Sequence, residues 1–195
     1  PTYPWRNQPY RMADSQEATD IAGAADDHPL LGYQRHAGTG PWLAHIDTTL
    51  LPWLADHVGD TSTVFPAAGF VEMVLAAAAR ALGDGPIEIR ALDILRPLVF
   101  EDGETAEVRT EIDASSDLID ISSRRRLVEP TFGLHVRARV GRPPNEARTT
   151  IALPTATGPA MSGDELYALT ARFGLHYGPA FRRAVSVVPT GERSL

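Results

Sequence analysis

The 195-residue sequence contains neither cysteine nor lysine, and all 18 of its basic residues are arginines. Without cysteine, the chain can form no disulfide, thiolate metal site or cysteine nucleophile. Without lysine, it has no P-loop lysine, Schiff-base lysine or lysine general base. The formal net charge is −7. Because nucleic-acid binding needs a basic surface that neutralises phosphates, we expect no nucleic-acid partner.

Long apolar runs are missing as well. The longest stretch, residues 71–79, is too short to span a bilayer and includes Glu72. Residues 1–6 lack the apolar core of a signal peptide. A hydrophobic share of 43% with 22% charged residues is typical of a folded chain. We therefore expect a cytoplasmic protein with no membrane partner.

The strongest secondary-structure signal predicts a helix over residues 67–82. Pro66 stands at its start, where proline is favoured, and Gly83 and Gly85 follow its end. The segment is alanine-rich and apolar nearly all round. A helix with no polar face is expected to be buried on all sides.

Short apolar runs with strand-like character follow this helix. They are residues 87–95, 98–100, 106–112, 118–122 and 132–140. Polar turns separate these runs. One of the turns contains Arg124, Arg125 and Arg126, which we expect to form a solvated loop. Contact of these arginines with an acidic carrier protein is the less favoured alternative. One buried helix followed by several strands predicts an α+β hotdog fold, in which a curved antiparallel sheet wraps a long helix.

Composition divides the chain into three parts. Residues 1–27 contain few apolar side chains and are interpreted as a linker. Residues 28–150 hold the helix and the predicted strands. Within residues 151–195, Ser162 and Glu165 have the spacing of a capping box, and the helix that they open is expected to end near Gly174.

His57 is the first candidate for chemistry, because it lies shortly before the predicted helix start at Pro66. The partial positive charge of a helix start attracts a substrate oxygen and disfavours a protonated imidazole, and a general base must be neutral. The alternative is a structural histidine that Asp56 or Asp60 satisfies. A metal site from these three residues lacks a recognisable ligand pattern, so we predict no metal.

Tyr177, Gly178 and Pro179 form the second candidate. Glycine and proline favour a turn, and the neighbouring aromatic residues suit the wall of an apolar channel. The alternative is a packed loop after a helix. The remaining histidines, His28, His36, His45 and His135, stand alone in the sequence and are expected to be mostly solvated or structural.

Several motifs together resemble the dehydratase domains of modular type I polyketide synthases. His57 and Pro66 have the spacing of the family's His-x-x-x-Gly-x-x-x-x-Pro signature, and residues 51–57 are similar to its approach to the histidine. Residues 28–32, His-Pro-Leu-Leu-Gly, resemble the opening segment of the family. Residues 175–181 resemble its Tyr-Gly-Pro-x-Phe motif.

One residue departs from the signature, because Thr61 stands where the family has glycine. Glycine permits a positive φ angle there, which β-branched threonine disfavours. Either the loop follows a different path that uses Gly59, or the site is altered.

The resemblance implies that the chain is the first half of a double hotdog. Residues 1–27 would be the linker that follows an acyltransferase-type domain, and residues 28–150 the amino-terminal hotdog. Residues 151–195 would be a second linker and the truncated start of the second hotdog.

The resemblance also implies a reaction. His57 would be the general base that removes a C2 proton from a 3-hydroxyacyl thioester, giving a 2-enoyl thioester and water. The substrate contacts would come from Thr61, Pro66 and the turn formed by Tyr177, Gly178 and Pro179. The family's acid is an Asp of the second hotdog, which is not assigned to any residue here, so we expect no dehydration by this chain alone.

The implied partners are an acyl carrier protein, whose phosphopantetheine carries the substrate, the neighbouring synthase domains, and a second copy in a homodimer. No other cofactor is expected. Two alternatives stay open: a hotdog isomerase that shifts a double bond with the same histidine, and a non-catalytic scaffold or dimerisation module, which Thr61 favours slightly.

Overall fold

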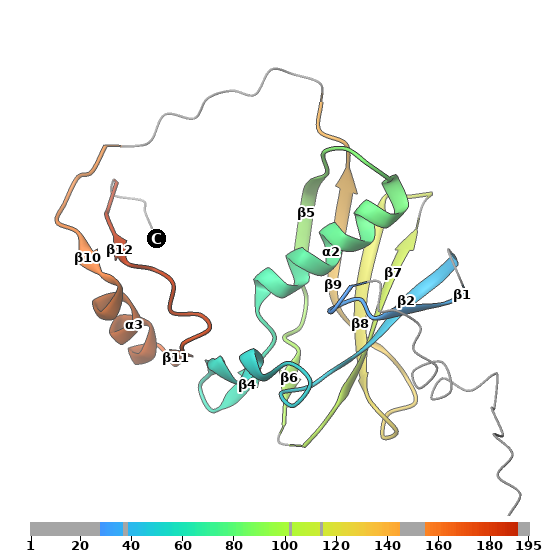
Figure 1. Cartoon of the computed structure of the whole chain (residues 1–195), viewed down its shortest axis with the longest axis horizontal. Coiled ribbons are helices and arrows are strands. Elements are labelled where there is room, and N and C mark those ends of the chain that lie inside the picture. The colour runs from blue at the N-terminus through green and yellow to red at the C-terminus, as the bar shows by residue number, and fades with distance from the viewer. Residues whose placement is uncertain (1–27, 37–38, 102, 114, 145–154, 191–195) are drawn as a thin grey trace, which may run out of the picture.

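The computed structural model describes residues 28–190 except for 37–38, 102, 114 and 145–154 (Figure 1). The predicted amino-terminal linker, residues 1–27, lies outside the described residues. Among the described helices, none is long and apolar enough to cross a bilayer.

The main layer is a six-stranded antiparallel sheet with the order β1-β2-β7-β8-β9-β5 (Figure 1). Its strands are β1 (Tyr33–His36), β2 (Thr39–Ile46), β5 (Glu88–Ile94), β7 (Ala106–Asp113), β8 (Leu118–Arg125) and β9 (Gly133–Gly141). The short apolar runs of the sequence predicted β5, β7, β8 and β9 to within a few residues at each end. On β8 and β9, Ile119, Ile121 and Val136 are fully buried because they point to the covered face.

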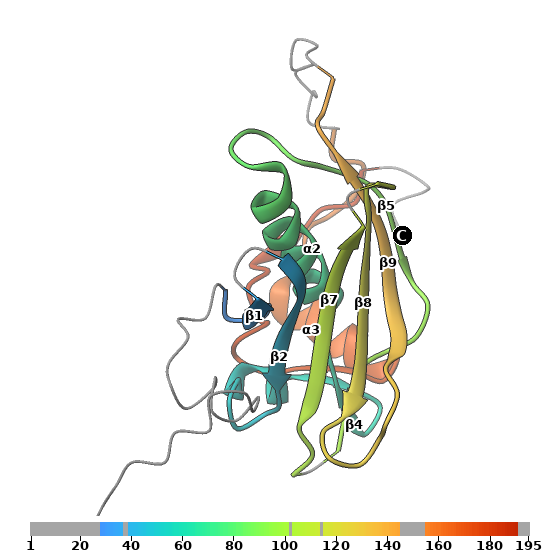
Figure 2. The ribbon, with the colours of Figure 1, turned by 90° about the vertical axis from the view of Figure 1, so that its right-hand side faces the viewer.

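Helix α2 (Ala67–Leu82) lies across one face of this sheet (Figure 2). It buries Phe70, Met73 and Val74 against the strands, and the fully buried Ala77 and Ala78 let the backbone approach the sheet closely. The predicted limits of the helix are confirmed.

The expectation that α2 is buried on all sides is wrong. Val71 and Glu72 are exposed, because the sheet covers only one side of the helix. Glu72 accepts a hydrogen bond from His28, whose Nε2 lies 3.2 Å from the Glu72 Oε1. His28 therefore anchors the start of the folded region to the helix.

A second, four-stranded sheet lies near the start of α2 and has the order β11-β3-β4-β6. Its strands are β3 (His57–Gly59), β4 (Ser62–Val64), β6 (Val99–Phe100) and β11 (Leu175–Tyr177). The short 3-10 helix η1 (Pro52–Asp56) leads directly into β3. This sheet joins the carboxy-terminal segment to the middle of the chain.

The carboxy-terminal segment contains β10 (Met161–Ser162), α3 (Gly163–Arg172) and β12 (Ser186–Val187). The predicted capping box is confirmed: the Ser162 side chain accepts a hydrogen bond from the Glu165 N–H, and the Glu165 carboxylate accepts one from the Ser162 N–H. The helix ends before Gly174, whose φ of 80° suits glycine. The predicted boundary at residue 151 falls among residues 145–154, outside the described part.

The expectation of a solvated arginine loop at residues 124–126 is wrong for Arg124 and Arg125, whereas Arg126 lies in the turn that follows β8. Arg124 and Arg125 end strand β8. The Arg124 guanidinium lies 2.7 Å from the buried carboxylate of Glu107, and Arg125 pairs with Glu104 and Glu129. A nearly buried carboxylate requires a cation, which draws Arg124 onto the sheet.

Candidate functional site

His57 is the first residue of β3, directly after η1, and its side chain is half-buried. Its Nδ1 lies 2.8 Å from the carbonyl oxygen of Val64, across the β3–β4 hairpin. A carbonyl oxygen can only accept a hydrogen bond, so the Nδ1 of His57 must donate its hydrogen to Val64. In the neutral imidazole, Nε2 is then left with a lone pair, as a general base requires.

The backbone of the hairpin explains how the chain tolerates threonine at position 61. Asp60 adopts the left-handed conformation with a φ of 53°, whereas Thr61 and Gly59 do not. Aspartate tolerates this conformation better than a β-branched residue does. The hairpin turn therefore takes its positive φ at Asp60 and not at Gly59. Thr61 lies exposed in the turn, and its role in substrate binding stays a prediction.

Aromatic side chains lie beside the imidazole on the face shared with β11. Tyr177 stands directly opposite His57 in the strand register, with 5.5 Å between the ring centroids. Phe181 lies 5.0 Å from the His57 ring and 6.0 Å from the Trp53 ring. The structure thus brings the two candidate segments together, more than a hundred residues apart in the sequence, and makes one side of the imidazole apolar.

The segment after β11 folds into a turn. The Phe181 N–H donates to the Gly178 carbonyl over 3.0 Å, with Pro179 at the second position of the turn, where its fixed φ is favoured. The turn returns the Phe181 ring toward His57. Pro179 itself is exposed, and the substrate contacts predicted for Gly178 and Pro179 stay predictions.

Pro66 is buried at the N-cap of α2, two residues after Val64. Its carbonyl accepts hydrogen bonds from the Gly69 and Phe70 N–H groups. Among the described residues, no side chain caps this end of the helix. The helix start therefore lies close in the chain to the carbonyl that holds His57, as the spacing predicts.

Sequence reasoning missed Tyr167 as part of the site and expected a different partner for Asp56. The Tyr167 ring packs edge-on against Tyr177 at 5.9 Å, and its hydroxyl donates to the Phe181 carbonyl over 3.2 Å. Asp56 does not satisfy His57, as one alternative expected, because its carboxylate accepts a hydrogen bond from the Ala180 N–H. No sequence signal identified Tyr167; the only signal for Asp56 was its position beside His57.

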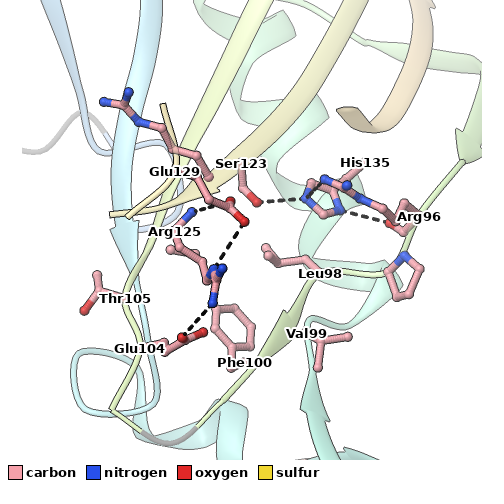
Figure 3. A pocket seen from close by; sticks show the side chains of 13 residues that line it. Arg96, Leu98, Val99, Phe100, Glu104, Thr105, Ser123, Arg125, Glu129 and His135 are labelled. Carbon is pink, nitrogen blue, oxygen red and sulfur yellow. Dashed lines mark hydrogen bonds and ion pairs between the residues drawn. The ribbon is translucent and has the colours of Figure 1, made fainter. Parts of the chain in front are cut away.

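A second polar region surrounds the buried His135 on β9, which lines a pocket of about 230 Å³ (Figure 3). Its Nδ1 donates to the Arg96 carbonyl over 3.1 Å, and its Nε2 lies 2.8 Å from the Ser123 hydroxyl. Burial lowers the pKa of His135, because a low-dielectric environment disfavours the charged form. His135 is thus a structural histidine, as expected, and fastens the segment before β6 to the sheet.

Within the described residues, no three His, Asp or Glu side chains gather closely enough to hold a metal ion. Asp56 faces Ala180, and Asp60 lies in the hairpin turn beside Gly174. The three residues weighed as a metal site from the sequence do not converge.

The fold and the site define a hotdog protein with a half-buried histidine beside an aromatic wall. The family model described as polyketide synthase dehydratase domain matches residues 28–127. The chain belongs to this family.

Curated relatives agree with this assignment. The chain is 32% identical over its whole length to a phenolphthiocerol/phthiocerol polyketide synthase of Mycobacterium tuberculosis, and covers 11% of that protein. It is 30% identical over its whole length to the polyketide synthase ThaG of Burkholderia thailandensis, and covers 4% of it. The chain therefore spans about a tenth or less of the length of these relatives.

Solved dehydratase structures confirm the hotdog fold. The dehydratase domain of PpsC from Mycobacterium tuberculosis aligns with a TM-score of 0.61 at 28% identity, covering 84% of this chain and 60% of that one. A trans-AT polyketide synthase dehydratase domain from Brevibacillus brevis aligns with a TM-score of 0.69 at 20% identity, covering 85% of this chain and 65% of that one.

Proposed function

We propose that the chain is the histidine-bearing half of a dehydratase that converts a 3-hydroxyacyl thioester into a 2-enoyl thioester. The thioester is held on the phosphopantetheine of an acyl carrier protein. The neighbouring synthase domains and a second copy of the domain complete the set of partners, and the cytoplasm is the proposed location. The observation that supports this proposal most strongly is the hydrogen bond between His57 Nδ1 and the Val64 carbonyl, 2.8 Å long.

His57 Nε2 accepts the C2 proton of the substrate, which the thioester carbonyl acidifies. The C2 electron pair forms the C2–C3 double bond, and the C3 hydroxyl departs as water after an acid protonates it. The acid is proposed to come from the second half of the family's double hotdog, and no acidic residue of this chain is assigned to that role. A positioned base contributes about 10²–10⁴-fold to such a rate.

The aromatic wall supports the same step. Tyr177 and Phe181 lie beside the imidazole, so that an acyl chain packed on them would keep water from the reacting carbon. The uncapped start of α2 supplies backbone N–H groups to the thioester oxygen, which becomes more negative as the C2 proton leaves.

The proposal is tested with the intact dehydratase domain, its second half included, on a 3-hydroxyacyl thioester of its carrier protein. The His57→Ala variant should lower kcat by about 10²–10⁴-fold. His176→Ala is the matched control, since His176 is exposed on the neighbouring strand, and it should keep the wild-type rate. Mass spectrometry follows the loss of water.

Two outcomes would contradict the proposal. A domain that leaves the 3-hydroxyacyl thioester unchanged but shifts the double bond of a 2-enoyl thioester supplied in its place would show the isomerase. Wild-type and His57→Ala domains with equal and negligible turnover would show the non-catalytic scaffold.

A further inference from the structure

We propose that Asp56 is a positioning residue that, together with the backbone N–H of Asp60, fixes the register of β11 on β3 and so holds Tyr177 opposite His57. This inference rests on the proposed function, because it assigns a purpose in the reaction to residues that do not touch the substrate. The two aspartates flank β3, and Gly174 and Gly178 flank its partner β11.

Two sets of contacts, here called clamps, join the ends of β3 to the ends of β11, and Asp56 forms the first. Its carboxylate Oδ2 accepts a hydrogen bond of 2.8 Å from the Ala180 N–H, and its carbonyl accepts one of 2.7 Å from the Gly178 N–H. A Cβ atom on Gly178 would overlap the Asp56 carboxylate. Only glycine lets the two segments approach this closely, and the negative carboxylate makes the bond to Ala180 stronger than a neutral acceptor would.

Asp60 forms the second clamp at the other end of the strand pair. Its N–H donates to the Gly174 carbonyl over 2.6 Å. A Cβ atom on Gly174 would overlap the Asp60 carboxylate, and the φ of Gly174 is 80°. Position 174 therefore requires glycine for its backbone conformation as well as for the contact.

The clamps matter because the strands between them are short. β3 and β11 each contain three residues, which pair as Gly59 with Leu175, Val58 with His176, and His57 with Tyr177. A pair this short specifies its own register weakly. A slip of one residue would turn the Tyr177 ring to the opposite face of the sheet, away from the imidazole.

The register thus determines the surroundings of the proposed base. With Tyr177 opposite His57, the turn that follows brings Phe181 to 5.0 Å from the imidazole. A displacement of about 1 Å in such a site can lower a rate by about a hundredfold. Asp56 contributes most, since its carboxylate holds the turn that carries Phe181.

The test measures kcat and KM for variants of the intact dehydratase domain. Asp56→Ala removes the acceptor for the Ala180 N–H and should lower kcat/KM about 10- to 100-fold. Asp56→Asn keeps an oxygen acceptor and should restore activity to within a few-fold of wild type. Asp84→Ala, which changes an exposed aspartate at the far end of α2, should leave kcat/KM unchanged.

A second measurement does not depend on the folding of Asp56→Ala. In the wild-type domain, the Ala180 amide should exchange with deuterium slowly, and in Asp56→Asn it should stay protected. A folded Asp56→Ala domain with wild-type kcat/KM, no rescue by Asp56→Asn, or a rapidly exchanging Ala180 amide would each overturn the inference while leaving the proposed function intact. Failure of the proposed function differs from these results, because the wild-type domain itself would not dehydrate.

Discussion

Gly178 tests whether the two halves of the site meet as closely as the structure shows. Its backbone does not adopt a positive φ, so replacement by alanine imposes no conformational penalty. The new Cβ atom would overlap the Asp56 carboxylate, which the Ala180 N–H holds at 2.8 Å. Gly178→Ala therefore forces the carboxylate or the turn to move.

The size of the effect follows from the competing contributions. Overpacking costs about 1–3 kcal/mol, or the carboxylate moves away and its hydrogen bond, about 1.5–3 kcal/mol, is lost instead. Because movement of the carboxylate relieves the overpacking, the cost of overpacking and the cost of the lost hydrogen bond do not add. The reduced freedom of alanine in the unfolded chain offsets about 0.4–1 kcal/mol. We expect Gly178→Ala to lower the free energy of unfolding by about 1–2 kcal/mol.

Urea denaturation of the intact domain measures this free energy. Gly141→Ala is the matched control, because the atoms nearest to its new Cβ would be those of the exposed Arg90 guanidinium, which can move aside. In an Asp56→Ala background, Gly178→Ala should cost at least about 0.5 kcal/mol less than it does alone. A Gly178→Ala domain as stable as wild type, or an equal cost in both backgrounds, would refute the reasoning.

Two further predictions concern stability. Burial lowers the pKa of His135 below 6.5. Below about pH 6.5 this histidine therefore binds a proton more readily in the unfolded chain than in the folded protein. The free energy of unfolding should fall as the pH drops through this range. In His135→Gln this slope should be shallower between about pH 6.5 and pH 5, and equal slopes would contradict the assignment. Arg124→Ala should lose about 2–3 kcal/mol, since it leaves a nearly buried carboxylate without this cation. Arg137→Ala breaks an exposed ion pair and should lose less than about 1 kcal/mol; equal losses in thermal denaturation would contradict the difference in burial.

The parts of the fold that depend on local patterns could be predicted from the sequence. Helix α2 begins after Pro66 and ends before Gly83, where the residues themselves favour a start and a stop. The strands β7, β8 and β9 of the main sheet coincide with the short apolar runs of the sequence, and buried and exposed positions alternate clearly in the second half of β9. The one-sided burial of α2 could not be predicted, because alanine suits a close sheet and an exposed face equally.

The site depends on contacts between distant segments, and these have no local signal. His57 could be recognised by its spacing from Pro66. The hydrogen bond from its Nδ1 to the Val64 carbonyl could not be predicted, because it depends on the geometry of the hairpin. The positive φ of the hairpin turn falls at Asp60, and only the backbone shows it. The packing of Tyr167 on Tyr177 likewise appears only in three dimensions.

The central claim is that His57 carries its hydrogen on Nδ1 and keeps a free lone pair on Nε2. Nitrogen NMR of the intact dehydratase domain, labelled with ¹⁵N-histidine and assigned with the His57→Ala variant, tests it directly. We predict that neutral His57 is the Nδ1–H tautomer, with the Nδ1 hydrogen coupled to the Val64 carbonyl. A neutral His57 found as the Nε2–H tautomer would contradict the claim, because the nitrogen that must accept the C2 proton would already carry one.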